Sequence, residues 1–475
     1  MMVNESIVWY PGRLARHRKY RCWLAGFFVL LASSLAAPQP AQAQAPGAPP
    51  SQPVPSNASL PQCIEFALRN QPLVRQSQLD EQIGERNIRI GLSSWLPQVN
   101  GTGIYTRNIQ LQTTVFPDLT NPSGPQQVIR IGLANTSTLG VAASQLLFSN
   151  DVLRAARSVK PTRLVYQQTT TANKIDVVTN VSKAFYNILL TEEQLKILDE
   201  DIQRQERQVR DSKARLDAGI VDKTDYLRAT VSARNAYAQR RSTAASLPGL
   251  YSTLKQLMGL GPEKPLALQY DTLQMVRETQ LDTTERLVPE RRIEIQQLQT
   301  QKRLQSINID YYRYGFLPTL SSFYNYNRVY QNNNFSELYK TVYPNQQAGA
   351  QFALPLFTGL RRIQNLKIAR LQDDRLDLDL FDTKNQITTE YDQAMGTYKG
   401  ALAQLNALQD NLVDAKEVYR VINLQYREGI KTFLELTVAE ADLRTAQLTY
   451  YNALFNVLSS KLDVQRALGN ITFNQ

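Results

Sequence analysis

The chain has 475 residues, 43% of them hydrophobic, and a formal net charge of +11. This length and this hydrophobic content are enough for one large unit or several domains. It contains two cysteines and a single histidine, which argues against a Cys/His zinc cluster, a histidine triad and a histidine proton shuttle. Its basic residues are spread along the chain rather than clustered, which argues against nucleic-acid binding. The sequence shows neither a carboxylate pair that stands out as catalytic nor a phosphate-binding glycine loop, which argues against an enzyme.

The first 43 residues have the pattern of a secretory signal peptide. Five basic residues precede the apolar run Trp23–Ala37, and Ala41-Gln42-Ala43 places small residues at a cleavage site. An uncleaved membrane anchor is the alternative, but the apolar run is short for a helix that spans a bilayer. Residues 1–43 are therefore expected to be removed on export, and His17 is removed with them.

Residues 44–59 are rich in proline, glutamine, alanine and serine. This composition predicts a disordered linker, because it offers too little apolar surface to bury. The ordered chain is expected to begin near Leu60. Cys63 is then the only cysteine of the exported chain, and it has no partner for an internal disulfide.

Beyond the linker the chain repeats itself once, in structural repeats expected at residues 60–270 and 271–475. Two of the matches are WLPQVN at Trp95–Asn100 with FLPTLS at Phe316–Ser321, and LLFS at Leu146–Ser149 with PLFT at Pro355–Thr358. Matching positions lie 221 residues apart in the first pair and 209 apart in the second, so the loop between them is longer in the first half. Such self-similarity predicts two copies of one structural unit.

Each half contains two segments with a period of two, the pattern of a β-strand with one apolar face. These segments are Val99–Val115 and Thr138–Phe148 in the first half, and Leu320–Tyr330 and Gln347–Phe357 in the second. Alternating segments with aromatic ends are typical of an outer-membrane barrel. A soluble β-hairpin is the alternative that the pattern alone leaves open.

Four strands cannot close a barrel around a channel. Strand edges that faced lipid would leave backbone N–H and C=O groups without hydrogen bonds. We therefore expect several copies of the chain to share one barrel, each contributing four strands. The pattern does not fix the number of copies.

Each strand pair is followed by two long helices that are expected to form a hairpin. The outgoing helices are expected at Asp151–Ala218 and Leu360–Glu428, and the returning helices at Lys223–Met258 and Thr432–Leu468. An outgoing helix of this length spans roughly 100 Å at 1.5 Å per residue. A glycine, Gly219 or Gly429, is expected to end each outgoing helix in the left-handed conformation.

The outgoing helices carry a heptad seam, in which the seam positions recur at alternating spacings of four and three. This 3.5-residue period keeps one face of a helix toward a partner helix, as in a coiled coil. In the second half the seam comprises Ile387, Tyr391, Ala394, Tyr398, Ala401, Leu405, Leu408, Leu412, Ala415, Tyr419, Ile422 and Tyr426. In the first half it comprises Val177, Val181, Ala184, Ile188, Thr191, Leu195, Leu198, Ile202, Gln205, Val209, Ser212 and Leu216.

The order of signal peptide, helix, strand pair and long hairpin, with all but the signal repeated, resembles the TolC family of outer-membrane efflux proteins. FLPTLS, PLFTGLRR and the tip YREGIKTFLEL complete the resemblance, which covers nearly the whole exported chain. The fold that it implies is mainly α with membrane β, built from a two-fold internal repeat. Three chains would then form a 12-stranded β-barrel continued by a helical tunnel.

The resemblance implies an outer-membrane exit duct of a tripartite efflux or type I secretion system, with its helical tunnel in the periplasm. The implied partners are two further copies of the chain, a periplasmic adaptor, an inner-membrane pump and the outer-membrane lipid. Neither enzymatic activity nor a cofactor or metal is implied. A non-channel periplasmic coiled-coil scaffold is the alternative, and a drug, a metal ion or a protein remain open as the exported substrate.

The resemblance also places functional residues at the two hairpin tips. The adaptor is expected to dock on Ala218, Gly219 and Ile220 and on Glu428, Gly429 and Ile430. The periplasmic gate is expected to use Asp225, Tyr426, Lys431 and Glu435. Lysine at 431 replaces the arginine of the family, which removes its bidentate fork. Val438 stands where some members carry a second acidic residue.

Overall fold

The computed structural model describes residues 57–116, 127–220, 222–270, 272–471 and 473. The signal peptide expected at 1–43 and linker residues 44–56 lie outside these residues. Ala58, which was expected in the linker, pairs with Leu268 in an isolated bridge and is buried. The first helix begins at Leu60, where the ordered chain was expected to begin.

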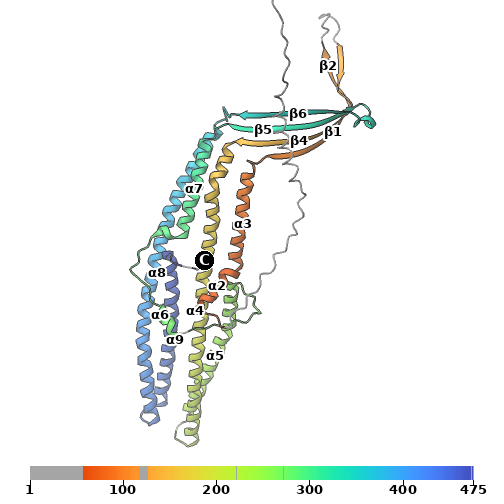
Figure 1. Cartoon of the computed structure of the whole chain (residues 1–475). Helices are drawn as coiled ribbons and strands as arrows, with labels where there is room; N and C mark the ends of the chain where they lie inside the picture. The colour runs from red at the N-terminus through yellow and green to blue at the C-terminus, as the bar shows by residue number, and fades with distance from the viewer. Residues whose placement is uncertain (1–56, 117–126, 221, 271, 472, 474–475) are drawn as a thin grey trace, which may run out of the picture. The chain divides into compact units, whose positions relative to one another are not determined.

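The first elements in chain order are two short helices, four strands and a pair of long helices (Figure 1). Their bounds are α2 Leu60–Asn70, α3 Pro72–Ser93, β1 Gln98–Arg107, β2 Gln112–Phe116, β3 Gln127–Ile131, β4 Asn135–Phe148, α4 Asn150–Asp217 and α5 Lys223–Met258. The expected helical hairpin is confirmed as α4–α5, and each of its helix ends lies within one residue of the expected position.

A similar succession follows, without a counterpart of β2 and β3. Its elements are α6 Thr272–Glu278, η1 Pro289–Arg291, α7 Ile293–Arg313, β5 Thr319–Asn332, η2 Phe335–Glu337, β6 Val342–Ala353, α8 Arg361–Arg427 and α9 Phe433–Leu468. The second hairpin, α8–α9, also has the expected ends to within one residue. None of the helices that the structure describes is long and apolar enough to cross a membrane.

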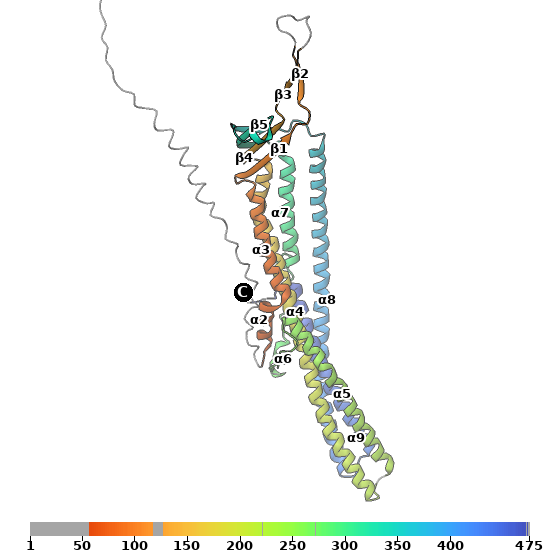
Figure 2. The ribbon, with the colours of Figure 1, turned by 90° about the vertical axis from the view of Figure 1, so that its right-hand side faces the viewer.

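Four strands form one antiparallel sheet in the order β1-β4-β5-β6. The central pair, β4–β5, joins strands that lie almost two hundred residues apart, with Ala143 opposite Tyr324. Figure 2 shows this sheet close to the ends of α3, α4, α7 and α8. In the described part of the chain β1 and β6 each pair on one side only, so the sheet has two open edges.

Two strand predictions were wrong in extent. The segment Val99–Val115 is interrupted after Arg107, where the Asn108 N–H donates to the Ala134 carbonyl at 2.7 Å. The chain then enters a separate two-stranded sheet, β2–β3, which supplies the longer loop expected in the first half. The strand expected at Gln347–Phe357 ends at Ala353, close to Pro355, which has no N–H to donate to a ladder.

The core lies where the two hairpins meet, and it is formed mainly by α4, α8 and α9. The seam prediction is confirmed, because every seam residue on α4 and α8 is buried or half-buried. α9 adds a buried apolar face through Leu454, Val457 and Leu458. Burial of this surface, rather than helix propensity, stabilises helices of such length.

Candidate functional site

The two hairpin tips have the same backbone structure. At the first tip the Ile220 N–H donates to the Arg215 carbonyl at 2.8 Å, and the Gly219 N–H to the Leu216 carbonyl at 2.9 Å. The second tip repeats these bonds at the matching positions, from Ile430 to Gln425 at 2.8 Å and from Gly429 to Tyr426 at 3.1 Å. This is the Schellman motif, which satisfies carbonyls at the end of a helix.

Glycine is required at this position of each tip. Gly219 has φ +70° and Gly429 has φ +77°, in the left-handed region that side chains disfavour. The turn leaves the following isoleucines in solvent, since Ile220 and Ile430 are each 71% exposed. Each tip is therefore a hydrogen-bonded turn with an exposed apolar side chain directly after its glycine.

The helices that leave the two tips are capped differently. At α9 the Thr432 hydroxyl accepts from the Glu435 N–H at 3.3 Å, while the Glu435 carboxylate accepts from the Thr432 N–H at 2.9 Å. This reciprocal pair is a capping box. At α5 the N-cap residue Asp222 makes no side-chain cap bond and accepts instead from the Thr224 hydroxyl at 2.9 Å.

Glu435 is thus a structural residue of the second tip as well as a candidate gate residue. Its carboxylate also binds the Lys431 ammonium at 2.5 Å. The Lys431 side chain, followed by the Thr432 groups, lowers the pKa of Glu435 to about 2. Since a lowered pKa means that the ionised form is stabilised, this cap is complete above the ordinary pKa of glutamate and is lost only as pH falls through about 2.

Tyr426 lies at the meeting point of the two tips. Its ring packs edge-on against Phe433 at 6.2 Å between centroids, and the Arg215 guanidinium of α4 lies 4.7 Å above it. Burial raises the pKa of Tyr426; among the nearby charges Arg215 lowers it, and Asp225 and Asp211 raise it. The structure therefore brings Tyr426 and Asp225 into one electrostatic environment.

Lys431 does not join that environment within a single chain. Its ammonium binds Glu435 on its own tip rather than Asp225 on the other. The Asp225 carboxylate makes no hydrogen bond or ion pair with another described residue. The latch expected between Lys431 and Asp225 is therefore not formed within the single chain.

Two features of the tips were missed in the sequence. The capping box was visible as the motif Thr432-x-x-Glu435 directly before an apolar run. Arg215 carried no such signal, because its contact with Tyr426 joins helices more than two hundred residues apart in the chain. Only the packing of the two hairpins brings its guanidinium over the ring.

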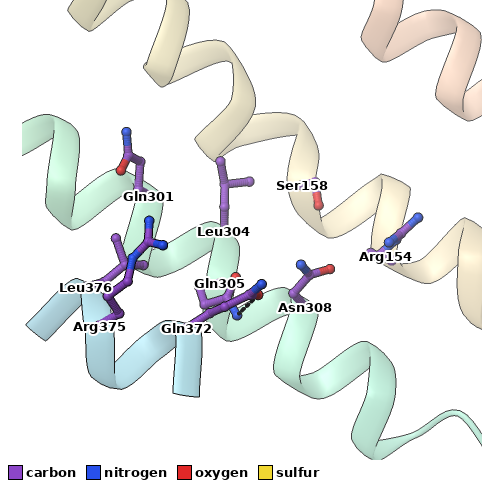
Figure 3. A pocket seen from close by; sticks show the side chains of 9 residues that line it. All are labelled: Arg154, Ser158, Gln301, Leu304, Gln305, Asn308, Gln372, Arg375 and Leu376. Atoms are coloured by element: carbon purple, nitrogen blue, oxygen red, sulfur yellow. Dashed lines mark hydrogen bonds between the residues drawn. The ribbon is translucent and has the colours of Figure 1, made fainter. Parts of the chain in front are cut away.

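A cleft of about 440 Å³ lies away from the tips, between α4, α7 and α8 (Figure 3). Its lining carries amides and two guanidiniums but no carboxylate. The Gln305 amide already donates to the Ala369 carbonyl at 2.7 Å and to Gln372 at 3.2 Å, and the Arg154 guanidinium lies 4.4 Å from the Tyr311 ring centroid. In the described residues no group of three or more His, Cys, Asp or Glu could hold a metal ion. The tips remain the best candidate site.

Comparison with known proteins places the chain among outer-membrane proteins. A family model described as outer membrane efflux protein matches residues 63–260 and 286–470. The probable efflux pump outer membrane protein TtgC of Pseudomonas putida is 22% identical over 88% of this chain and 84% of its own length. The outer membrane protein TolC of Vibrio cholerae is 21% identical over 80% of this chain and 83% of its own length.

A solved structure shares the fold. The Campylobacter jejuni CmeC outer membrane channel superposes with a TM-score of 0.66 and 18% identity, over 86% of this chain and 85% of that one. At this level of identity the match supports the arrangement of helices and strands and not the function of individual side chains.

The glycine of the second tip allows a direct test of the turn. We expect Gly429→Ala to lower the stability of the folded protein by about 1 kcal/mol per chain, because a Cβ is strained at positive φ. Glu428→Ala is the matched control, since Glu428 has φ −80° and ψ 0° and tolerates a side chain. Thermal unfolding in detergent, followed by circular dichroism, measures both variants. Equal losses would show that the left-handed turn does not require glycine.

Proposed function

The chain belongs to the outer membrane efflux protein family, and we propose that it assembles as a trimeric exit duct joined to a periplasmic adaptor and an inner-membrane pump. It is an outer-membrane efflux channel and not an enzyme. Membership of the family rests on a model that matches most of the chain in two segments. These two segments also support the proposed division into repeats at 60–270 and 271–475.

The observation that carries the trimer is the open four-stranded sheet. Its edge strands β1 and β6 leave one side of each backbone without a ladder partner. Pairing β6 of one copy with β1 of the next would satisfy these groups, and three copies would close a barrel of 12 strands. A closed barrel has no edges, so the arrangement also prevents uncontrolled aggregation.

The outer face of α8 supports the same assembly. The N-terminal half of α8 exposes several large apolar side chains along the helix, and contiguous exposed apolar surface of this kind marks an interaction site. These side chains include Ile368, Leu371, Leu378 and Phe381. These four are 51–68% exposed in one chain. Contact with a second copy would bury them, which stabilises an assembly roughly in proportion to the apolar area removed from water.

The tips suit a docking partner. Each presents an exposed isoleucine on a turn whose backbone is already hydrogen-bonded, so little order has to be imposed on binding. We therefore propose Ala218, Gly219 and Ile220 and Glu428, Gly429 and Ile430 as the adaptor contacts. A non-channel periplasmic scaffold does not fit a family of outer membrane efflux proteins.

Assembly and conduction test this function together. We expect the full chain, purified from outer membranes in mild detergent, to be a monodisperse trimer that conducts ions in a planar bilayer. Light scattering gives the mass, and single-channel recording gives the conductance. A well-folded monomer that conducts no current would overturn the proposal.

The alternation of β5 predicts which side chains meet lipid. Tyr326 accepts a hydrogen bond from Arg328 Nε at 3.1 Å, so these two side chains lie on one face of β5, as a period of two requires. We expect Tyr324→Lys to hinder membrane insertion, because a charge on the lipid face costs about 2–4 kcal/mol at mid-depth. Asn325→Lys, on the proposed lumen face, is the control and should insert normally. Heat-modifiable migration in gels measures insertion, and equal defects at the two sites would contradict the proposed sidedness.

The tip charges predict the behaviour of the gate. In a trimer three copies of Asp225 and of Glu435 would gather at the narrow end, where a ring of carboxylates attracts cations. We expect Asp225→Asn to increase single-channel conductance by loosening the closed end, and Glu435→Gln to reduce cation selectivity. Thr432→Ala, which weakens the same cap without removing a charge, separates the electrostatic effect of Glu435 from its structural effect. Unchanged conductance and unchanged selectivity would leave both carboxylates as ordinary helix-end residues.

A further inference from the structure

The contact between the two hairpins changes its chemistry along its length. α4 and α9 run antiparallel, with Lys183 beside Asp463, Gln194 beside Asn452 and Gln205 beside Glu440. In the upper part their buried residues are mostly apolar, including Ile188 and Leu189 on α4 and Leu454 and Val457 on α9. Toward the tips α9 stays apolar at Leu436 and Leu443, whereas α4 buries, beside Ile202, the polar residues Asp201, Gln205, Gln208 and Ser212.

This buried polar joint contains two carboxylates with different surroundings. Asp201 is fully buried and accepts from two guanidiniums, Arg204 at 3.3 Å and Arg444 at 3.0 Å. Glu440 is 2% exposed, and it accepts a hydrogen bond from the neutral amide of Gln205 at 3.0 Å. Both arginines therefore satisfy Asp201, and Glu440 is left to neutral partners.

The charged and titratable groups around Glu440 come from all three packed helices. α4 contributes Arg204, which attracts its charge, and Asp201, which repels it. α8 contributes the phenol of Tyr419, and α9 itself contributes Arg444, which is bound to Asp201. Burial is the largest influence and raises the pKa of Glu440 to about 7.

Two buried acceptors near Glu440 have no partner among the described residues. They are the amide oxygens of Gln205 and Gln208, and both side chains lie at 8% exposure or less. A carboxylate can only accept hydrogen bonds, whereas a protonated carboxyl also donates one. Rotating the terminal amide of Gln205 by about 180°, which exchanges its oxygen and nitrogen, would bring the oxygen to the O–H of a protonated Glu440. Two buried donors, Gln208 Nε2 and Arg204 Nε, are also without a partner among the described residues, so the hydrogen bonding of this joint is incomplete in the packed state.

We propose that this joint is a proton-operated hinge between the two hairpins, in which a proton on Glu440 keeps α4 packed against α9. The proton comes from solvent to a carboxylate oxygen of Glu440, and no other bond is made or broken. When it leaves, a second buried negative charge appears beside Asp201, and its desolvation is costly because the nearby guanidiniums of Arg204 and Arg444 are bound to Asp201. Admission of water then stabilises the ionised form, and the lower parts of α4 and α9 separate.

The direction of the pH dependence follows from the raised pKa. Between the ordinary pKa of glutamate and about 7, the packed state holds a proton that the separated state does not. Packing is therefore tightest at low pH and weakens as pH rises through about 7. An effect of the hinge on the gate rests on the proposed duct function. The movement of α4 against α9 can be measured without measuring transport.

Hydrogen exchange on the purified full-length protein tests the hinge. After correction for the intrinsic pH dependence of exchange, we expect amides in 197–210 and 434–446 to exchange at least about tenfold faster at pH 8 than at pH 5. Glu440→Gln, which is always neutral, should remove this increase and stay protected at both pH values. Asp442→Asn is the matched control on the same helix and should keep the increase, because Asp442 is exposed to solvent and belongs neither to the joint nor to the tip.

An increase that persists in Glu440→Gln, or that is missing from the unmodified protein, would overturn the hinge. A measurement on the unmodified protein covers the case in which the variant does not fold. The infrared band of protonated carboxyls should retain one component that disappears with a midpoint near pH 7, and its absence would also overturn the proposal. A conducting trimer with no pH-dependent exchange would remove the hinge and keep the duct, and a non-conducting protein with the predicted exchange would do the reverse.

Discussion

The pairing of β4 with β5 is the contact on which the rest of the structure depends. It joins two segments that lie far apart in the chain into one sheet. β4 is followed by the long helix α4, and β5 is preceded by the helix α7. Because β4 runs directly into α4 while α7 runs into β5, the register of this pair sets α4 beside α7. The hairpins then meet through α4 and α9, where most of the apolar core is buried.

Much of this architecture could be predicted from the sequence, because periodicity is a local property. The 3.5-residue seam predicts both outgoing helices. Gly219 and Gly429 predict where these helices end, since glycine adopts the left-handed conformation at little cost. The strand ends were less certain. Nothing local in Val99–Val115 shows that pairing with β4 stops at Arg107, because that depends on where the partner strand begins.

The candidate site could be predicted only in part, for the same reason. The tip turns follow from local hydrogen bonds, and the resemblance to a family supplied the residues around them. The contact of Arg215 with Tyr426 and the pairing of Gln205 with Glu440 both cross between hairpins. Gln205 and Ser212 are polar members of the heptad seam, and the structure shows both of them in the buried polar joint.

That joint gives the two ends of the hairpin contact different mechanical properties. Separating the apolar upper part would expose hydrocarbon to water, at a cost that grows with the area exposed. Separating the lower part exposes amides and charges that water solvates well, with fewer apolar side chains such as Ile202 and Leu436, so its net cost is smaller. Movement between α4 and α9 should therefore begin below Leu198, while the upper core keeps the hairpins joined and the sheet in register. A channel built this way can change the width of its tips without disturbing the strands that meet the membrane.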